Sequence, residues 1–143
     1  MDLLQFYLSL GWHLLPLHRA LPDGHCTCGR KPCPDKPGKH PRTEHGQKDA
    51  SNGPAQIEEW CKRWPETNWG VLCDVSGFAA IDVDPRDGGD KTFAALVERC
   101  GPLPPGPVQL TGGGGWHHLV LPPAGRILRG TLGRDSGIQI KYN

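Results

Sequence analysis

The sequence predicts a single α+β domain of mixed helices and strands, with one loop stapled by a metal ion. Its 143 residues suit one compact domain with one hydrophobic core. Short apolar runs show helical spacing in some segments and strand spacing in others, without internal repeats. A hydrophobic fraction of only 36%, with 20 glycines and 15 prolines, indicates many turns and long irregular connections. We therefore expect one domain over residues 1–143, C-terminally truncated because the sequence stops at or just after its last strand.

The helices and strands are predicted from the spacing of apolar residues. A first helix over residues 3–10 ends where Gly11 follows it. A second begins between Ser51 and Pro54 and ends before Pro65, and a third covers residues 92–100. Strands are expected at residues 12–17, 68–72, 78–83, 108–111, 118–121 and 137–141. The two strands at 68–72 and 78–83 are expected to form a hairpin that leads into an acidic motif.

The charge balance limits how the chain can meet nucleic acid. With 16 basic and 15 acidic residues, the net charge of +1 gives no overall field that would draw the protein onto DNA. A local basic patch lies within residues 30–48 and is equally well interpreted as a solvated loop. No window approaches the eighteen apolar residues of a membrane span, and no secretory leader is recognisable, so we expect a cytoplasmic protein without a membrane partner.

A metal-binding pattern occupies the long segment that lacks apolar periodicity. The spacing is C-x-C-x4-C-x6-H, and three thiolates with one imidazole suit tetrahedral Zn²⁺. The predicted ligands are Cys26, Cys28, Cys33 and His40. His25 is a competing ligand, and the remaining cysteines are expected to be packed thiols. A loop insertion over about residues 24–42 would otherwise have nothing to order it, so we expect a structural zinc site there.

A pair of carboxylates ends the apolar run at residues 78–83. Alternate residues of a strand face one side, so Asp82 and Asp84 should project together. Two adjacent carboxylates are unfavourable without a cation, and divalent ions reverse that balance. Such a platform serves phosphoryl transfer, although the same residues also suit a simple turn. A calcium loop fits less well, because no Glu closes it.

A glycine turn follows at residues 112–115. Backbone amides of glycines can approach phosphates closely, and His117 and His118 come directly after the turn. No Gly-Lys-Ser/Thr follows, so the segment is not a P-loop. A plain glycine hairpin is the alternative. Together with the upstream carboxylates, a histidine beside this turn suits a triphosphate contact or a proton donor near a metal.

Taken in order, these features resemble the bifunctional DNA primase/polymerase family of the archaeo-eukaryotic primase superfamily. The resemblance covers nearly the whole chain. It rests on Gly11-Trp12 with Leu15-Pro16-Leu17, the Cys-rich run ending Pro37 to Arg42, His45 to Ser51, Trp64-Pro65, Asn68 to Val71, Gly77 to Pro85, and Thr111 to His117. Each motif alone is weak evidence for the family, but all of them in this order are specific for it.

The resemblance implies an RNA-recognition-motif-like catalytic sheet. Asp82 and Asp84 match the acids that bind Mg²⁺ or Mn²⁺, and His117 matches the histidine that touches the incoming nucleotide. The implied nucleotide or template contacts are Lys39, Arg42 and His45. As a mechanistic hypothesis, we expect the amides of Gly113, Gly114 and Gly115 to hold the triphosphate with His117, and Lys141 or Arg134 to neutralise charge near the metals. The implied activity is primer synthesis and DNA polymerisation during replication of a phage, plasmid or mobile element. The implied partners are a single-stranded DNA template, a primer, dNTP or NTP, and a helicase or ATPase domain.

One position departs from the family pattern. The third motif places an acid on a strand, and here Gln139 takes that place, with Asp135 able to substitute only if the register shifts. A neutral amide oxygen approaches a metal without balancing the charge of a second cation. Gln139 therefore favours a second interpretation, a catalytically weak module that binds nucleotide or single-stranded DNA within a larger replication protein. A rolling-circle nuclease would need two histidines separated by one apolar residue, which His117-His118 do not supply.

Overall fold

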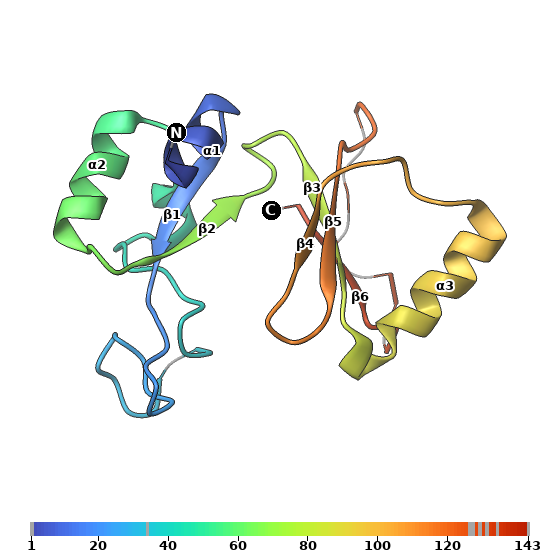
Figure 1. Cartoon of the computed structure of the whole chain (residues 1–143), viewed down its shortest axis with the longest axis horizontal. Coiled ribbons are helices and arrows are strands. Elements are labelled where there is room, and N and C mark those ends of the chain that lie inside the picture. Colours follow the sequence, from blue (N-terminus) through green and yellow to red (C-terminus); the bar gives the residue numbers. More distant parts are fainter. Residues whose placement is uncertain are drawn as a thin grey trace. The chain divides into compact units, whose positions relative to one another are not determined.

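The computed structural model describes residues 2–33, 35–125, 128, 130, 132–133 and 135–142. The chain divides into two compact units, Met1–Ser76 and Gly77–Asn143, and each is described by itself (Figure 1). Both contain helices and antiparallel strands, which confirms the predicted α+β class. The single domain over residues 1–143 stays a prediction. In the described part of the chain, no helix is long and apolar enough to cross a membrane.

The first unit packs two helices against a two-stranded ribbon. Its elements are α1 (Leu3–Ser9), β1 (His13–Leu17), the 3-10 turn η1 (Gly46–Asp49), α2 (Pro54–Arg63) and β2 (Asn68–Leu72). Strands β1 and β2 are antiparallel, and α2 begins with Pro54 in its first turn, as predicted. Ile57 and Trp60 of α2 are buried against Leu14 of β1. Apolar residues at helical spacing therefore form the core of this unit.

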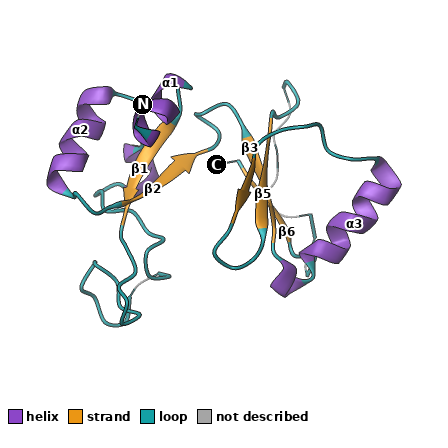
Figure 2. Ribbon diagram, viewed as in Figure 1, coloured by secondary structure: helices purple, strands orange, loops and turns teal. Residues whose placement is uncertain are grey.

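A long loop joins β1 to α2 (Figure 2). It is held against the outer edge of β1 by backbone hydrogen bonds: the amide of Arg42 donates to Pro16 at 2.9 Å, and the amide of His18 donates to the carbonyl of His40 at 2.9 Å. Further along, Ser51 and Leu14 exchange two bonds of 2.8 and 3.0 Å. The second half of the loop is thus held along β1.

The second unit is a four-stranded antiparallel sheet with one helix. Its elements are β3 (Ala79–Val83), η2 (Pro85–Asp87), α3 (Gly89–Cys100), β4 (Val108–Leu110), β5 (Trp116–Val120) and β6 (Ile138–Lys141), with strand order β4-β5-β3-β6. Helix α3 lies along one face of the sheet (Figure 1). There the Phe93 ring stacks on His118, with ring centroids 4.9 Å apart, and meets the edge of Trp116. The opposite face carries the polar side chains that concern function.

The predicted hairpin of the strands at 68–72 and 78–83 is wrong. Strand β2 pairs with β1, whereas β3 lies between β5 and β6, so both of its edges are already hydrogen-bonded. Two apolar runs joined by a short turn are the local pattern of a hairpin. Here, however, each strand pairs with strands that are distant in sequence. Strand β5 also begins two residues earlier than predicted, at Trp116, so that His117 belongs to the sheet.

Candidate active site

A row of polar side chains crosses the second unit's sheet. Directly opposed residues on neighbouring strands project to the same face. The register places in one row Gln109 of β4, His117 of β5, Asp82 of β3 and Gln139 of β6. The predicted metal ligand, the predicted nucleotide contact and the position of the missing acid therefore lie side by side. Three segments of the chain, far apart in sequence, meet at Asp82.

Asp82 lies between two nitrogen groups. Its carboxylate is 3.3 Å from Nε2 of His117 on one side and 3.5 Å from Nζ of Lys141 on the other. Lys141 also donates a short hydrogen bond to Oε1 of Gln139. The Asp82 side chain is 23% exposed, so it is accessible to a ligand while still held by the sheet. The predicted role of Lys141 in neutralising charge near a metal stays a prediction.

His117 is held through both ring nitrogens. Its Nδ1 lies 3.3 Å from Oε1 of Gln109, and its Nε2 faces Asp82. These two contacts fix the ring with Nε2 directed at the carboxylate side of the site. Gln109 is thus a positioning residue for His117.

Asp84 lies one residue beyond β3 and opens the η2 turn. Its Oδ1 accepts the backbone amide of Arg86 at 3.0 Å. The Arg86 guanidinium binds both oxygens, with Nε to Oδ1 at 3.0 Å and Nη2 to Oδ2 at 2.7 Å. Hydrogen bonding to Asp84 and the charge of Asp84 raise the pKa of Arg86, and the charges of Asp87 and Asp82 add to this. The guanidinium therefore lies within electrostatic reach of both carboxylates of the acidic motif.

The glycine turn connects β4 to β5, and its glycines serve different physical needs. A side chain at Gly113 would start 2.9 Å from Cζ of Arg86. Gly114 has a φ of +81°, which favours glycine. A Cβ on Gly115 would lie 2.3 Å from the carbonyl oxygen of Val83, so glycine lets the turn approach β3. The amides of Gly114 and Gly115 donate to Thr111, at 3.0 and 3.1 Å, and hold the turn closed.

The oxygen atoms of this site are of the kind that binds a hard divalent cation. Asp82 and Asp84 supply carboxylate oxygens, and Gln139 supplies an amide oxygen opposite Asp82. Within the described residues, however, these acids and His117 do not form a compact group of three or more metal ligands. Each carboxylate is instead turned towards a basic side chain of the protein, Lys141 or Arg86. A cation would bind here by replacing those partners.

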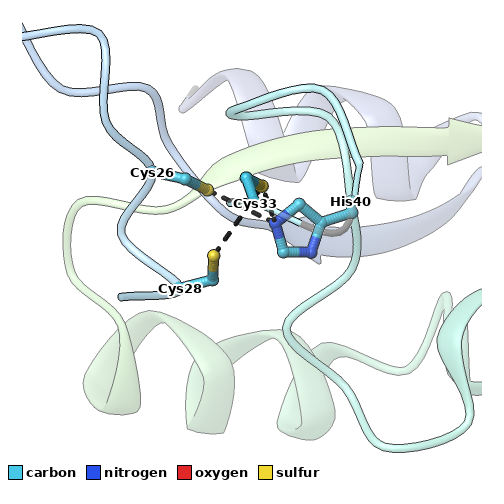
Figure 3. A group of neighbouring side chains, drawn as sticks. All are labelled: Cys26, Cys28, Cys33 and His40. Carbon is cyan, nitrogen blue, oxygen red and sulfur yellow. Dashed lines mark hydrogen bonds between the residues drawn. The ribbon is translucent and has the colours of Figure 1, made fainter. Parts of the chain in front are cut away.

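The first unit contains a second ligand group, built by the long loop. Cys26, Cys28, Cys33 and His40 converge from both arms of the loop, as Figure 3 shows. Their ligand atoms all lie within 4.8 Å of one another. The sulfurs of Cys28 and Cys33 are 3.8 Å apart, and Nε2 of His40 lies 3.3 Å from Cys26 and 3.4 Å from Cys33. Tetrahedral zinc with Zn–S bonds of about 2.3 Å separates two sulfurs by roughly 3.8 Å, so this group could hold zinc.

The electrostatics of the cysteine group favour a thiolate at Cys26. Burial by itself raises the pKa of Cys26, but hydrogen bonds at the backbones of Cys28 and Gly38 and from neighbouring side chains lower it to about 6. Burial raises the pKa of Cys33. Burial and the charges of His40 and Arg42 lower the pKa of His18, whose ring lies 4.5 Å from the His40 ring. Zn²⁺ binds cysteine as the thiolate, which the lowered pKa of Cys26 favours.

The three other residues predicted to contact nucleotide or template lie in the first unit. Arg42 donates to the carbonyl of Leu17 at 3.1 Å and to Thr27 at 3.2 Å, so it also braces the loop. His45 pairs with Asp49 at 3.1 Å, and Lys39 is exposed. Their predicted contacts stay predictions, as does the role of Arg134, which lies outside the described residues.

Comparison with known proteins decides the family. Residues 4–143 match the family model described as Prim-Pol, the N-terminal domain of bifunctional DNA primase/polymerase. The chain belongs to this family. No curated protein and no solved structure gives a significant match. The match spans both compact units, so the Prim-Pol domain includes the cysteine loop as well as the polar row.

Two residues of this Prim-Pol domain were missed by reasoning from the sequence. Gln109 is one of many polar residues near a proline-rich stretch, and only the register of β4 with β5 brings it to His117. Arg86 follows Asp84 by two residues, a spacing that could have suggested a local ion pair. Its contact with Gly113 could not be anticipated, because it depends on how the glycine turn folds over β3.

Proposed function

We propose that this domain catalyses template-directed nucleotidyl transfer, making primers and extending DNA on a single-stranded template. The observation that carries the proposal is the row that sets Asp82 between His117 and Gln139, in a chain that belongs to the Prim-Pol family. An acid, an imidazole and an amide oxygen on one open sheet face suit a triphosphate and the divalent cation that accompanies it.

The roles follow from the chemistry of each group. Asp82 and Asp84 would hold Mg²⁺ or Mn²⁺, with Gln139 as a weaker third ligand. When bound, the cation lowers the pKa of the attacking 3′-hydroxyl and neutralises the leaving pyrophosphate. His117, fixed by Gln109, would donate to a phosphate oxygen, and Lys141 would balance negative charge beside Asp82. The glycine turn would border the triphosphate.

Primer synthesis and extension on single-stranded DNA with Mn²⁺ test the proposal directly. Asp82→Ala should reduce either activity by at least about a hundredfold, because it removes a ligand of the catalytic cation. Asp90→Ala is the matched control, since Asp90 is an exposed acid in the first turn of α3. Undiminished synthesis by the Asp82 variant would overturn the assignment.

A second function is favoured by one specific observation. Gln139 stands opposite Asp82 where an acid would complete the metal site, and Lys141 already partners both residues. These features suit a catalytically weak module that binds nucleotide or single-stranded DNA. Calorimetry separates the two functions: a module that binds only DNA should have no triphosphate affinity that depends on Asp82 and Mn²⁺.

The biological setting belongs to the same proposal. We assign the domain to replication of a phage, plasmid or mobile element in the cytoplasm, with template, primer and dNTP or NTP as partners. A helicase or ATPase domain would act beside it. Unwinding activity in the protein that carries this domain, or in a partner purified with it, would support that setting.

A further inference from the structure

Arg86 lies beside the acidic motif but has no role in the proposed nucleotidyl transfer. Its guanidinium covers both oxygens of Asp84 in a two-bond fork, at 3.0 and 2.7 Å. A fork of this kind matches a carboxylate or a phosphate equally well, because both present two oxygens in one plane. Arg86 therefore blocks, from within the chain, the oxygens that a metal ion would need.

The same guanidinium also lies against the glycine turn. A Cβ at Gly113 would lie 2.9 Å from both Cζ and Nη2 of Arg86 and 3.3 Å from Nη1, so the guanidinium in this position lies directly against the glycine turn. One cationic group thus borders both the acidic motif and the segment proposed to border the triphosphate. A shift of the guanidinium from Asp84 to a phosphate would need only side-chain rotation.

The Arg86 to Asp84 pair is exposed enough to exchange partners. The Arg86 side chain is 69% exposed and that of Asp84 is 28% exposed. Pairs of this kind contribute little to stability, because water and salt screen them. A divalent cation offers Asp84 a stronger partner, and a triphosphate offers Arg86 several oxygens.

We propose that Arg86 is an internal competitor for the metal site, which binds Asp84 in the free protein and transfers to the triphosphate when metal and nucleotide arrive together. This inference rests on the proposed nucleotidyl-transfer function and adds a coupling to it. In the absence of nucleotide, Arg86 weakens cation binding at Asp84. In the presence of nucleotide, the released guanidinium strengthens triphosphate binding, so each ligand favours the other.

The first measurement is Mn²⁺ affinity of the zinc-loaded chain without nucleotide, read from the electron paramagnetic resonance signal of free Mn²⁺. Arg86→Ala should bind Mn²⁺ about two- to fivefold more tightly, the range expected on loss of an exposed pair. Arg86→Lys keeps the charge but loses the fork, and it too should bind more tightly. Arg99→Ala, an exposed arginine at the end of α3, should match the wild type.

The second measurement is calorimetric affinity for α,β-methylene dATP at saturating Mn²⁺. Arg86→Ala should bind this nucleotide about tenfold more weakly, because a charge-assisted contact to phosphate is lost. When Asp84 is already replaced by alanine, Arg86→Ala should no longer raise Mn²⁺ affinity, because the carboxylate for which Arg86 and Mn²⁺ compete is absent. Circular dichroism of each variant confirms that it is folded.

The outcomes separate this inference from the proposed function. Mn²⁺ affinity of Arg86→Lys equal to the wild type would overturn the competition, because charge alone would then explain the alanine variant. Unchanged nucleotide affinity of Arg86→Ala would overturn the transfer. If the wild type binds no nucleotide at all, the proposed function fails, whereas tighter Mn²⁺ binding by both Arg86 variants would still establish the competition with metal.

Discussion

At the scale of single residues, the polar row explains how a neutral amide can stand where the family pattern has an acid. Gln139 lies opposite Asp82, and its oxygen accepts from Lys141, which also faces Asp82. The lysine thus contacts Gln139 and places a positive charge beside Asp82. The amide is compatible with this arrangement because it donates and accepts without adding charge.

Gln139→Asp should raise Mn²⁺ affinity and primer extension, both by about tenfold. The added carboxylate would face Asp82 across β3 and β6 and would supply the missing negative ligand. Extension rates over a range of Mn²⁺ concentrations measure the effect. Gln139→Ala serves as the control, and equal rates for the aspartate and alanine variants would show that this position does not approach the metal.

At the scale of elements, the glycine turn at residues 112–115 and the cysteine loop between β1 and α2 are irregular segments that are ordered by contacts with their neighbours. The turn closes through bonds to Thr111 and lies against the backbone of β3 at Gly115. The loop is fixed by hydrogen bonds to β1, and its Cys26, Cys28, Cys33 and His40 side chains converge on one another. Neither segment has apolar periodicity, so contacts with a neighbouring strand or a metal must order it.

Gly115→Ala should destabilise the protein by about 2 kcal/mol or more, because its Cβ would lie 2.3 Å from the carbonyl oxygen of Val83. Gly112→Ala is the matched control, since a Cβ there meets nothing within 4 Å. Urea denaturation measures the free energy of unfolding of each variant. Equal stability of the two variants would mean that the turn does not approach β3 this closely.

Zinc removal should lower the melting temperature by at least about 10 °C, because the free energy of metal binding contributes directly to folding of the loop. Cys28→Ser should reproduce the effect and lose zinc, since it removes one of the ligands. Cys100→Ser, at an exposed cysteine outside the group, should keep its zinc. Elemental analysis and calorimetric melting provide the measurements, and a stable, zinc-free wild type would contradict a structural zinc site.

At the scale of the whole molecule, charge and organisation limit what the chain can do. A net charge of +1 leaves binding of DNA to local contacts. The acidic motif lies in the second unit, and the basic cysteine loop lies in the first. Within the described residues, each unit has its own sheet, so the candidate active site is built by the second unit's own strands.

Binding of a single-stranded oligonucleotide should depend only weakly on salt. Each phosphate neutralised on a single strand contributes about −0.7 to the slope of log affinity against log salt, so local contacts with about four phosphates would give a slope of about −3. Fluorescence anisotropy of a labelled oligonucleotide over a range of KCl concentrations measures this slope. A slope of about −6 would indicate an extended basic surface that the charge balance does not suggest.

Much of the fold was determined by local sequence. The stripe of Ile57 and Trp60 and the Pro54 start predicted α2, and alternation predicted β3, because the period of apolar residues reflects local geometry. The grouping of Cys26, Cys28, Cys33 and His40 was also predictable, since four such residues at close spacing in one loop need little help from the rest of the chain to meet. The ordered motifs likewise predicted the family, which the family match confirms.

Tertiary structure alone decided which strands became neighbours, and with them the composition of the candidate site. Pairing of β3 with β5 and β6 excluded the expected hairpin and brought His117 and Gln139 to Asp82. The folding of the glycine turn over β3 gave Arg86 its place on Gly113. Strand pairing between distant segments depends on burial and register over the whole sheet, which no local pattern in the sequence records.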